Sequence, residues 1–223
     1  MSEQIEDLQN GYYIIQNHDY FCFGKDAVLL ADFAKVKKGE TVIDFGCGNG
    51  IIPILLCAKY KNNGMTVVGL EIQEHNVDLA KRSVEMNSLG DRIDIKHGDI
   101  RNVAGTFKAE SFDVVVTNPP YMNVGGGRAN ETDAKSIARH EIMCSITDIA
   151  RATSRLLKFK GRLYMVHRPG RLVDIVTVFR EFGLEVKMLQ FVHGGVDKEP
   201  KMVLVEALKG GSPMCKVLPP MVL

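Results

Sequence analysis

Glycines spaced as Gly-x-Gly-x-Gly close an apolar run in the stretch VIDFGCGNG, at Gly46, Gly48 and Gly50. Glycine permits a tight turn with positive φ and lets a ligand lie against bare backbone. A dinucleotide site needs Gly-x-Gly-x-x-Gly, and the acid just ahead of these glycines, Asp44, would repel a pyrophosphate. The same acid would attract the ammonium of a methionyl group. The loop therefore favours S-adenosyl-L-methionine (AdoMet) as the ligand.

Two more acids follow the next apolar runs. Glu71 ends VVGLE, 21 residues after Gly50, where a carboxylate can accept hydrogen bonds from both hydroxyls of a ribose. Asp99, in HGDI, could accept a hydrogen bond from an exocyclic adenine amine. Each acid alone could be an ordinary loop cap at a strand end. Three of them at successive strand ends beside a glycine loop favour a nucleoside cofactor.

A rigid corner follows the run VVVT, in the residues Asn118, Pro119, Pro120 and Tyr121. The amide oxygen of Asn118 and the carbonyl of Pro119 are acceptors, and the consecutive prolines fix φ and remove two N–H donors. Such a pair suits an amino group on an sp² carbon, because accepting both N–H bonds directs its lone pair toward a donor methyl. Tyr121 offers an aromatic face for a planar group extruded from a stack. The alternative is a turn that merely stops a strand.

Strands and helices alternate from Thr41 onward. β-branched runs predict strands at 41–45, 66–71, 92–99, 112–118, 161–167, 184–192 and 202–208, and helical spacing predicts helices at 51–61, 73–89, 146–159 and 171–182. This alternation indicates an α/β fold with a doubly wound, largely parallel sheet. Residues 191–201 are too few for a crossover helix, so we expect the last two strands to form an antiparallel hairpin at one edge.

The 223 residues, 45% of them hydrophobic, can bury a sizeable core. We expect a domain at 41–208, preceded by a cap segment at 1–40 with an aromatic turn and a helix that begins near Lys25 or Asp26. The Gly- and Pro-punctuated tail at 209–223 is expected to be an edge segment or partly loose.

Charge and cysteine usage limit the possible partners and compartment. The formal net charge is +1, so a polyanion would have to bind a local basic patch. The five cysteines form no C-x-x-C pair and the six histidines show no metal spacing, which argues against a disulfide framework and a metal site. The chain shows no signal-like apolar segment and no run of about 18 apolar residues, so we expect a cytoplasmic protein without membrane contact.

Over roughly Asp19 to Leu208, the sequence resembles the Asn-Pro-Pro-Tyr amino-methyltransferases of the Rossmann-like AdoMet-dependent class. It is most similar to the bacterial tRNA1(Val) adenine-N6 methyltransferases, which modify adenine 37 beside the anticodon. The motifs that carry this similarity are GYYIIQNHDYFCFGKDAVLLADF, DFGCGNGIIPILL, NPPYM, RHE at 139–141 and VLVEALKGG.

The resemblance implies a seven-stranded Rossmann-like sheet whose last hairpin inserts antiparallel, a methyl transfer from AdoMet, and RNA, most simply tRNA, as the partner. It places the upstream motif near the methionyl end of AdoMet, Glu71 at the ribose and Asp99 at the adenine. The residues expected at the target amine are Asn118, Pro119, Pro120 and Tyr121. Those expected at the cofactor are Phe23, Gly24, Lys25, Asp44, Gly46, Cys47, Gly48, Gly50, Glu71, Asp99, Ile100 and Asn118.

Other functions remain open at this point. Glutamine N5-methyltransferases of release factors share the corner motif, but they normally carry a helical N-terminal domain. The roughly forty residues that precede the glycine loop here are too few for such a domain. Guanine-N2 rRNA enzymes usually have Phe in place of Tyr121. DNA adenine enzymes need a target-recognition region that this chain is too short to hold. A catalytically silent RNA-binding module would keep the same fold.

Basic side chains near the corner are candidate phosphate contacts or simply solvated charges. The segment 122–145 is Gly-rich at its start and could be a substrate lid or a plain surface loop. His140, near the end of this segment, is expected to have a packing or helix-capping role. The candidate phosphate contacts are Arg128, Lys135, Arg139, Lys158, Lys160, Arg162, Arg168 and Arg171.

Overall fold

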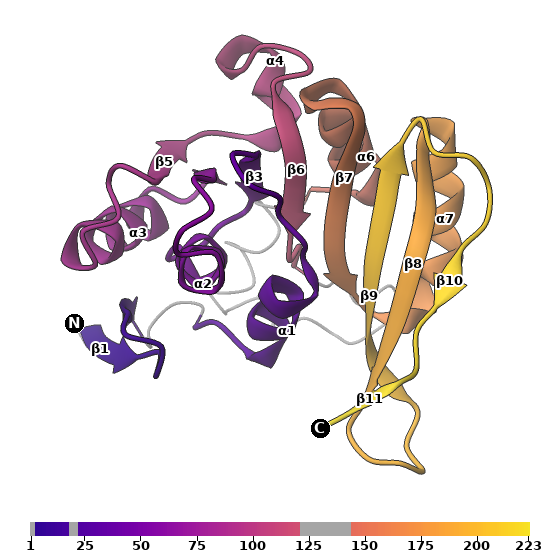
Figure 1. The fold of residues 1–223 in the computed structure, drawn as a ribbon, viewed down its shortest axis with the longest axis horizontal. Helices are drawn as coiled ribbons and strands as arrows, with labels where there is room; N and C mark the ends of the chain where they lie inside the picture. Colours follow the sequence, from indigo (N-terminus) through magenta and orange to yellow (C-terminus); the bar gives the residue numbers. More distant parts are fainter. Residues whose placement is uncertain (1–2, 18–21, 121–143) are drawn as a thin grey trace, which may run out of the picture.

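A nine-stranded sheet forms the centre of the protein in a computed structural model, which describes residues 3–17, 22–120 and 144–223 (Figure 1). Seven strands form its body: β3 (Thr41–Phe45), β4 (Thr66–Glu71), β5 (Ile93–His97), β6 (Phe112–Thr117), β7 (Leu157–His167), β8 (Leu184–His193) and β9 (Pro200–Lys209). The tail adds two short strands, β10 (Lys216–Val217) and β11 (Met221–Val222). The order across the sheet is β10-β8-β9-β7-β6-β3-β4-β5, and β11 also pairs with β8.

The direction of the strands confirms the predicted fold. β5, β4, β3, β6 and β7 are parallel to one another, while β9 lies antiparallel between β7 and β8. The hairpin predicted from the short 191–201 connection is therefore present, with β9 inserted inside the sheet. The tail extends the edge, because β10 and β11 both pair in parallel with β8.

Helices cover both faces of the sheet, as Figure 1 shows. One face carries α1 (Lys25–Phe33), α2 (Ile51–Lys59) and α3 (Glu74–Met86), and the other carries α4 (Val103–Thr106), α6 (Ile146–Leu156) and α7 (Leu172–Glu181). Side chains alternate along β6 between the two layers: Val114 and Val116 join the core under α1 and α2, and Val115 joins the core under α6 and α7. A strand buried on both faces is apolar throughout, which explains the run VVV.

The largest error in a predicted boundary lies between α6 and β7. The helix predicted to run to residue 159 ends at Leu156, and β7 begins at Leu157 instead of residue 161. Leu157 has extended backbone (φ −67°, ψ 137°), so it already leaves the helix. Lys160 has φ +62°, which interrupts the regular start of the strand. The apolar spacing of 156–159 does not distinguish the end of a helix from the start of a strand.

An N-terminal hairpin lies outside the main sheet and was not predicted. β1 (Glu3–Asp7) and β2 (Tyr13–Asn17) pair antiparallel, and β2 packs against α3. α1 then begins at Lys25, as the sequence predicts. Two short 3₁₀ turns, η1 (Ile100–Asn102) and η2 (Pro169–Arg171), complete the described elements.

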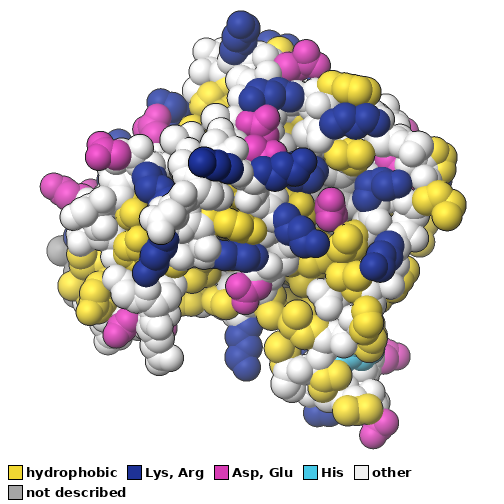
Figure 2. Space-filling view, viewed as in Figure 1, with side chains coloured by type: hydrophobic (Ala, Val, Ile, Leu, Met, Phe, Trp, Pro, Cys, Tyr) yellow, Lys and Arg dark blue, Asp and Glu magenta, His cyan; other side chains and the backbone are white. Residues whose placement is uncertain are grey.

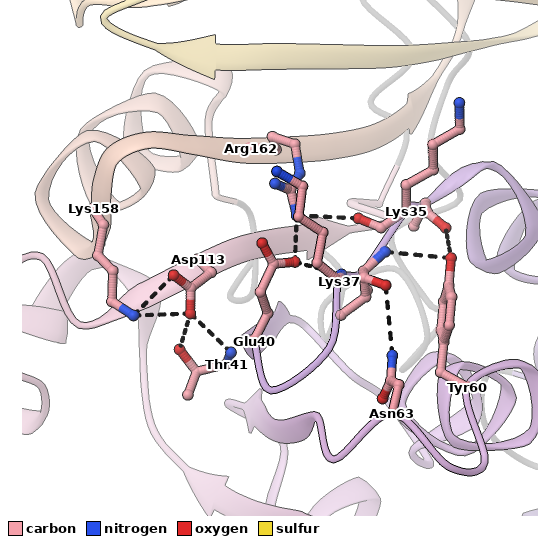
Figure 3. Close-up of polar contacts among 11 residues, drawn as sticks. Lys35, Lys37, Glu40, Thr41, Tyr60, Asn63, Asp113, Lys158 and Arg162 are labelled. Atoms are coloured by element: carbon pink, nitrogen blue, oxygen red, sulfur yellow. Dashed lines mark hydrogen bonds and ion pairs between the residues drawn. The ribbon is translucent and has the colours of Figure 1, made fainter.

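Ion pairs at the amino ends of the strands fix the connection between α1 and β3 (Figure 3). Arg162, on β7, pairs with Glu40 at 2.5 Å between Nη2 and Oε2, and both side chains are largely buried. Glu40 also accepts the backbone N–H of Lys37. Beside this pair, Lys158 donates to both oxygens of Asp113 at 2.8 Å. These contacts hold the start of β3 against β6 and β7.

We predict that Arg162→Ala lowers the free energy of unfolding by about 3 kcal/mol, because it leaves the Glu40 carboxylate buried without its charged partner. Urea unfolding followed by circular dichroism measures this change. Arg180→Ala is the control, since the Arg180 side chain is 57% exposed in its pair with Glu185 and its loss should change the midpoint little. An equal loss in the two variants would contradict the prediction.

Candidate active site

The register of the parallel strands brings the predicted polar residues to one edge of the sheet. Phe45 pairs with Leu70 on β4 and with Thr117 on β6. The residues that follow these partners, Glu71 and Asn118, therefore lie on either side of the start of the glycine loop. The structure thus gathers at one edge the acid, the loop and the corner that the sequence indicated separately.

The glycine loop makes a tight turn between β3 and α2. The N–H groups of Gly46 and Cys47 both donate to the carbonyl of Leu70, at 2.8 and 3.2 Å. Gly46, Gly48 and Gly50 have φ values of +70°, +55° and +89°, in the left-handed region where a side chain is strained. The spacing of the glycines is therefore required by the backbone of the turn, whatever ligand lies against it.

Glu71 joins this loop to β4. Its carboxylate accepts the N–H of Gly48 at 2.9 Å and the N–H of Gln73 at 2.8 Å. Burial raises the pKa of Glu71, and the hydrogen bonds from Gln73 and Gly48 oppose that rise. Because a carboxylate has about four acceptor positions, lone pairs remain for the hydroxyls of a ribose.

Asp44 is the most unusual group of the site. Its side chain is fully buried, and neither carboxylate oxygen has a hydrogen-bond partner among the described residues. Burial, and then the nearby charge of Glu71, raise the pKa of Asp44 well above its usual range. A buried carboxylate without a partner is costly, and a cation bound beside it would remove that cost. The ammonium of AdoMet fits this requirement.

The thiol of Cys47 belongs to the core. The side chain is 2% exposed, and a Cβ added to Gly69 on β4 would lie 2.8 Å from its sulfur. Burial, followed by the charges of Asp44 and Glu71, raises the pKa of this thiol well above its usual range. Position 47 can therefore contribute its backbone to the loop, while the thiol packs against β4.

Asp99 has a partner that the sequence analysis missed. Its carboxylate accepts the backbone N–H of Arg101 at 2.8 Å and pairs with the guanidinium at 2.5 Å. The hydrogen bonds from Arg101 lower the pKa of Asp99 and keep it ionised. The neighbouring Ile100 is buried in the core under α6 and α7. The sequence offers one sign of this pair: Arg101 follows Asp99 by two positions, at the start of a helical turn.

The Asn-Pro-Pro corner is anchored to β3. Thr117, just before it, donates its hydroxyl hydrogen to the carbonyl of Phe45 at 3.0 Å, and this contact is buried. Asn118 is half-buried, Pro119 is buried and Pro120 is exposed. Tyr121, the last member of the predicted corner, lies outside the described residues.

The upstream motif lies at the start of α1. Gly24 caps this helix, Lys25 is its first residue, and both are exposed. Phe23 packs against the core and donates its N–H to the side chain of Gln16 at 3.2 Å. The role of Gln16 was not predicted, because it depends on the hairpin that the sequence analysis missed.

The candidate phosphate contacts fall into separate groups. Arg128, Lys135, Arg139 and His140 lie outside the described residues, as does most of the 122–145 segment. Lys158, Lys160 and Arg162 lie near the amino end of β7, away from the corner, and they bind Asp113, the carbonyl of Gly210 and Glu40. Arg168 and Arg171 directly follow the carboxyl end of β7 and remain near the site edge.

Lys and Arg side chains are spread across the face drawn in Figure 2, mostly over its upper and central parts, with acidic side chains among them. Within residues 3–17, 22–120 and 144–223, no helix is long and apolar enough to cross a membrane. The same ranges contain no group of three His, Cys, Asp or Glu side chains that could hold a metal ion.

The family model of the methyltransferase small domain matches residues 18–182, which span the upstream motif, the glycine loop and the corner. The chain belongs to the methyltransferase small domain family. It is therefore an AdoMet-dependent methyltransferase, and the site just described is the candidate position of the cofactor. Bound there, AdoMet would supply an activated methyl group on a sulfonium, with Asp44 and Glu71 as its candidate charged contacts.

Curated and solved relatives agree with this assignment. A tRNA1(Val) (adenine(37)-N6)-methyltransferase of Aeromonas salmonicida is 25% identical over 182 residues, covering 82% of this chain and 74% of the relative. A structure described as a predicted O-methyltransferase of Agrobacterium tumefaciens has a TM-score of 0.72 at 20% identity, covering 88% of this chain and 86% of the other. A geranyl diphosphate C-methyltransferase of Streptomyces coelicolor, solved with S-adenosyl-L-homocysteine, has a TM-score of 0.59 at 14% identity, covering 83% and 80%. The two solved structures show the shared fold.

We predict that Asp44→Asn makes the ligand-free protein more stable by about 1–2 kcal/mol at neutral pH, because it removes a buried carboxylate without a partner. The same change should weaken AdoMet binding about tenfold or more, because the ammonium loses its counter-charge. Thermal unfolding and isothermal titration calorimetry measure the two effects.

The pH dependence follows from the raised pKa of Asp44. Above pH ~4 the folded, ligand-free protein holds a proton that the unfolded chain releases, so stability falls as pH rises toward the folded-state pKa. AdoMet affinity should rise over the same range, and Asp44→Asn should flatten both trends. If stability and AdoMet affinity changed with pH as steeply in Asp44→Asn as in the wild type, another group would be responsible for the titration.

Proposed function

We propose that this enzyme transfers a methyl group from AdoMet to the exocyclic N6 amine of an adenine in RNA, and that the RNA is tRNA, with adenine 37 of tRNA1(Val) as the target. The observation that carries the proposal is the corner at the end of β6. There Asn118 and Pro119 follow a strand end that Thr117 fixes to β3. This anchoring holds the acceptor pair beside the glycine loop.

The chemistry of the corner suits a poorly nucleophilic amine. The Asn118 side-chain oxygen and the Pro119 carbonyl would each accept one N–H of the adenine amine and direct its lone pair toward the methyl group. They also stabilise the positive charge that develops on nitrogen during the transfer. No general base is needed for the attack, because the product ammonium is acidic and loses a proton readily.

Two observations favour RNA over a protein amide as the acceptor. Several relatives, for example from Aeromonas salmonicida and Porphyromonas gingivalis, are named as tRNA1(Val) adenine-N6 methyltransferases. Arg168 and Arg171 lie just past the carboxyl end of β7, where they could contact phosphates of a bound strand. Arg171 also pairs with Asp174, whose side chain is 56% exposed, so a phosphate can compete for it.

The test is incubation with methyl-labelled AdoMet and, in separate reactions, total tRNA, rRNA or release factor. Digestion and nucleoside chromatography should recover the label as N6-methyladenosine from tRNA. Label on N2-methylguanosine, or on a glutamine of the release factor, would refute the adenine proposal. An RNA transcript of tRNA1(Val) with guanine in place of adenine 37 is the matched control and should accept no label.

We predict that Asn118→Ala reduces turnover by about 100- to 1,000-fold, the loss typical for one group that stabilises developing charge. AdoMet affinity should stay close to that of the wild type. Asn62→Ala, at an exposed position in the turn after α2, is the control and should leave both quantities unchanged. An Asn118→Ala variant with full activity would refute the role of the corner.

A further inference from the structure

We infer that Asn49 is a positioning residue, which couples the glycine loop to the N-terminal segment that carries Phe23, Gly24 and Lys25. The inference rests on the proposed position of the cofactor and does not depend on the identity of the methyl acceptor. Asn49 lies within the Gly-x-Gly-x-Gly motif. The turn itself requires no particular side chain at this position.

The free edge of β2 is bound by side chains in place of a neighbouring strand. The Tyr13 N–H donates to Asn87 Oδ1 at 2.8 Å, and Asn87 Nδ2 donates back to the Tyr13 carbonyl at 2.6 Å. Two residues along, the Ile15 N–H donates to Ser83 Oγ at 3.0 Å. Both Ser83 and Asn87 belong to the end of α3 and its cap. β1 pairs with the opposite edge of β2, so the hairpin docks on α3 through these bonds.

Asn49 supplies the remaining bond to this edge, from a different element. Its Nδ2 donates to the carbonyl of Ile15 at 3.1 Å, in a buried contact between residues 34 positions apart. The Asn49 side chain is itself buried, at 6% exposure. Its neighbour Gly48 donates its N–H to Glu71 at 2.9 Å. The glycine loop therefore binds the edge of β2 through Asn49, and through Gly48 it binds Glu71, the residue expected to contact the ribose.

The next residue of β2 carries the connection onward. Gln16 is also buried, and its Oε1 accepts the N–H of Phe23 at 3.2 Å. This bond fixes the chain immediately before Gly24, which caps α1. A continuous path of contacts, buried at Asn49 and part-buried at Phe23, thus runs from the glycine loop through Ile15 and Gln16 to the start of α1.

The path explains why an amide stands at position 49. The left-handed φ values at Gly48 and Gly50 form the turn, and the residue between them needs no particular side chain for that purpose. A buried carbonyl such as that of Ile15 does need a donor, and an unpaired one is costly. Asn49 meets this need and, at the same time, sets the distance between the two parts of the cofactor site.

The test compares variants that loosen the hairpin from different sides. Asn49→Ser shortens the side chain beyond reach of Ile15, and Asn49→Asp keeps its shape but removes the donor. Ser83→Ala is the matched control, because it removes the neighbouring bond to Ile15 from α3 and leaves the glycine loop unchanged. AdoMet affinity is measured by calorimetry and stability by thermal unfolding.

We expect both Asn49 variants to raise the AdoMet dissociation constant about three- to tenfold, the range for one lost hydrogen bond. Ser83→Ala should lower the unfolding temperature about as much as the Asn49 variants do, but it should leave the AdoMet affinity nearly unchanged. Hydrogen exchange gives a second readout: AdoMet should protect the amides of 22–30 and 46–52 in the wild type, but only those of 46–52 in Asn49→Ser.

Two results would overturn the inference. One is unchanged AdoMet affinity in both Asn49 variants, which would leave Asn49 with a purely structural role. The other is an equal loss of affinity in Ser83→Ala, which would assign the effect to the hairpin as a whole. Glu71→Ala separates these from an error in the cofactor site, because unchanged affinity in that variant would show that AdoMet binds elsewhere.

Discussion

The pairing of β3 with β4 on one side and β6 on the other is the constraint on which the site depends. Phe45 is level with both Leu70 and Thr117, so the glycine loop starts between Glu71 and Asn118. Three hydrogen bonds support this register: the amides of residues 46 and 47 donate to the carbonyl of Leu70, and the Thr117 hydroxyl donates to the carbonyl of Phe45. A shift of one residue would turn Asp44 to the opposite face of the sheet and separate it from Glu71.

The two buried acids differ in how their charge is compensated. Glu71 accepts two backbone N–H groups, which favour its ionised form. Asp44, at the same edge, has no such donor in the described part of the chain, and Glu71 adds repulsion. The ligand-free protein therefore holds this candidate cofactor site at a cost in stability, which a cationic ligand would relieve. Such local violations of packing rules are expected where a fold must bind something.

The sequence was sufficient for the parts of the fold that local patterns determine. The strands 41–45 and 66–71 were predicted to the residue, since buried parallel strands consist of β-branched runs that end in glycine or acid. The position of β9 between β7 and β8 was implied by the family resemblance, because a short connection alone indicates only a hairpin. The hairpin of β1 and β2 was missed because β1 is the exposed, mostly polar EQIED, which shows no buried face. The boundary between α6 and β7 failed where apolar residues continue without a break.

The contacts that assemble the site were the least predictable, because they join residues far apart in the chain. Ile15 meets Ser83 and Asn49 across 68 and 34 positions, and Tyr13 meets Asn87 across 74. Every one of these bonds pairs a polar side chain with the backbone of β2, whose sequence carries no sign of its partners. They give the N-terminal segment a fixed place although only one edge of β2 is paired with a strand. The glycine loop, α3 and the start of α1 are thereby connected through one short strand. A displacement of that strand would move both the glycine loop and the start of α1, which are the two parts of the candidate cofactor site.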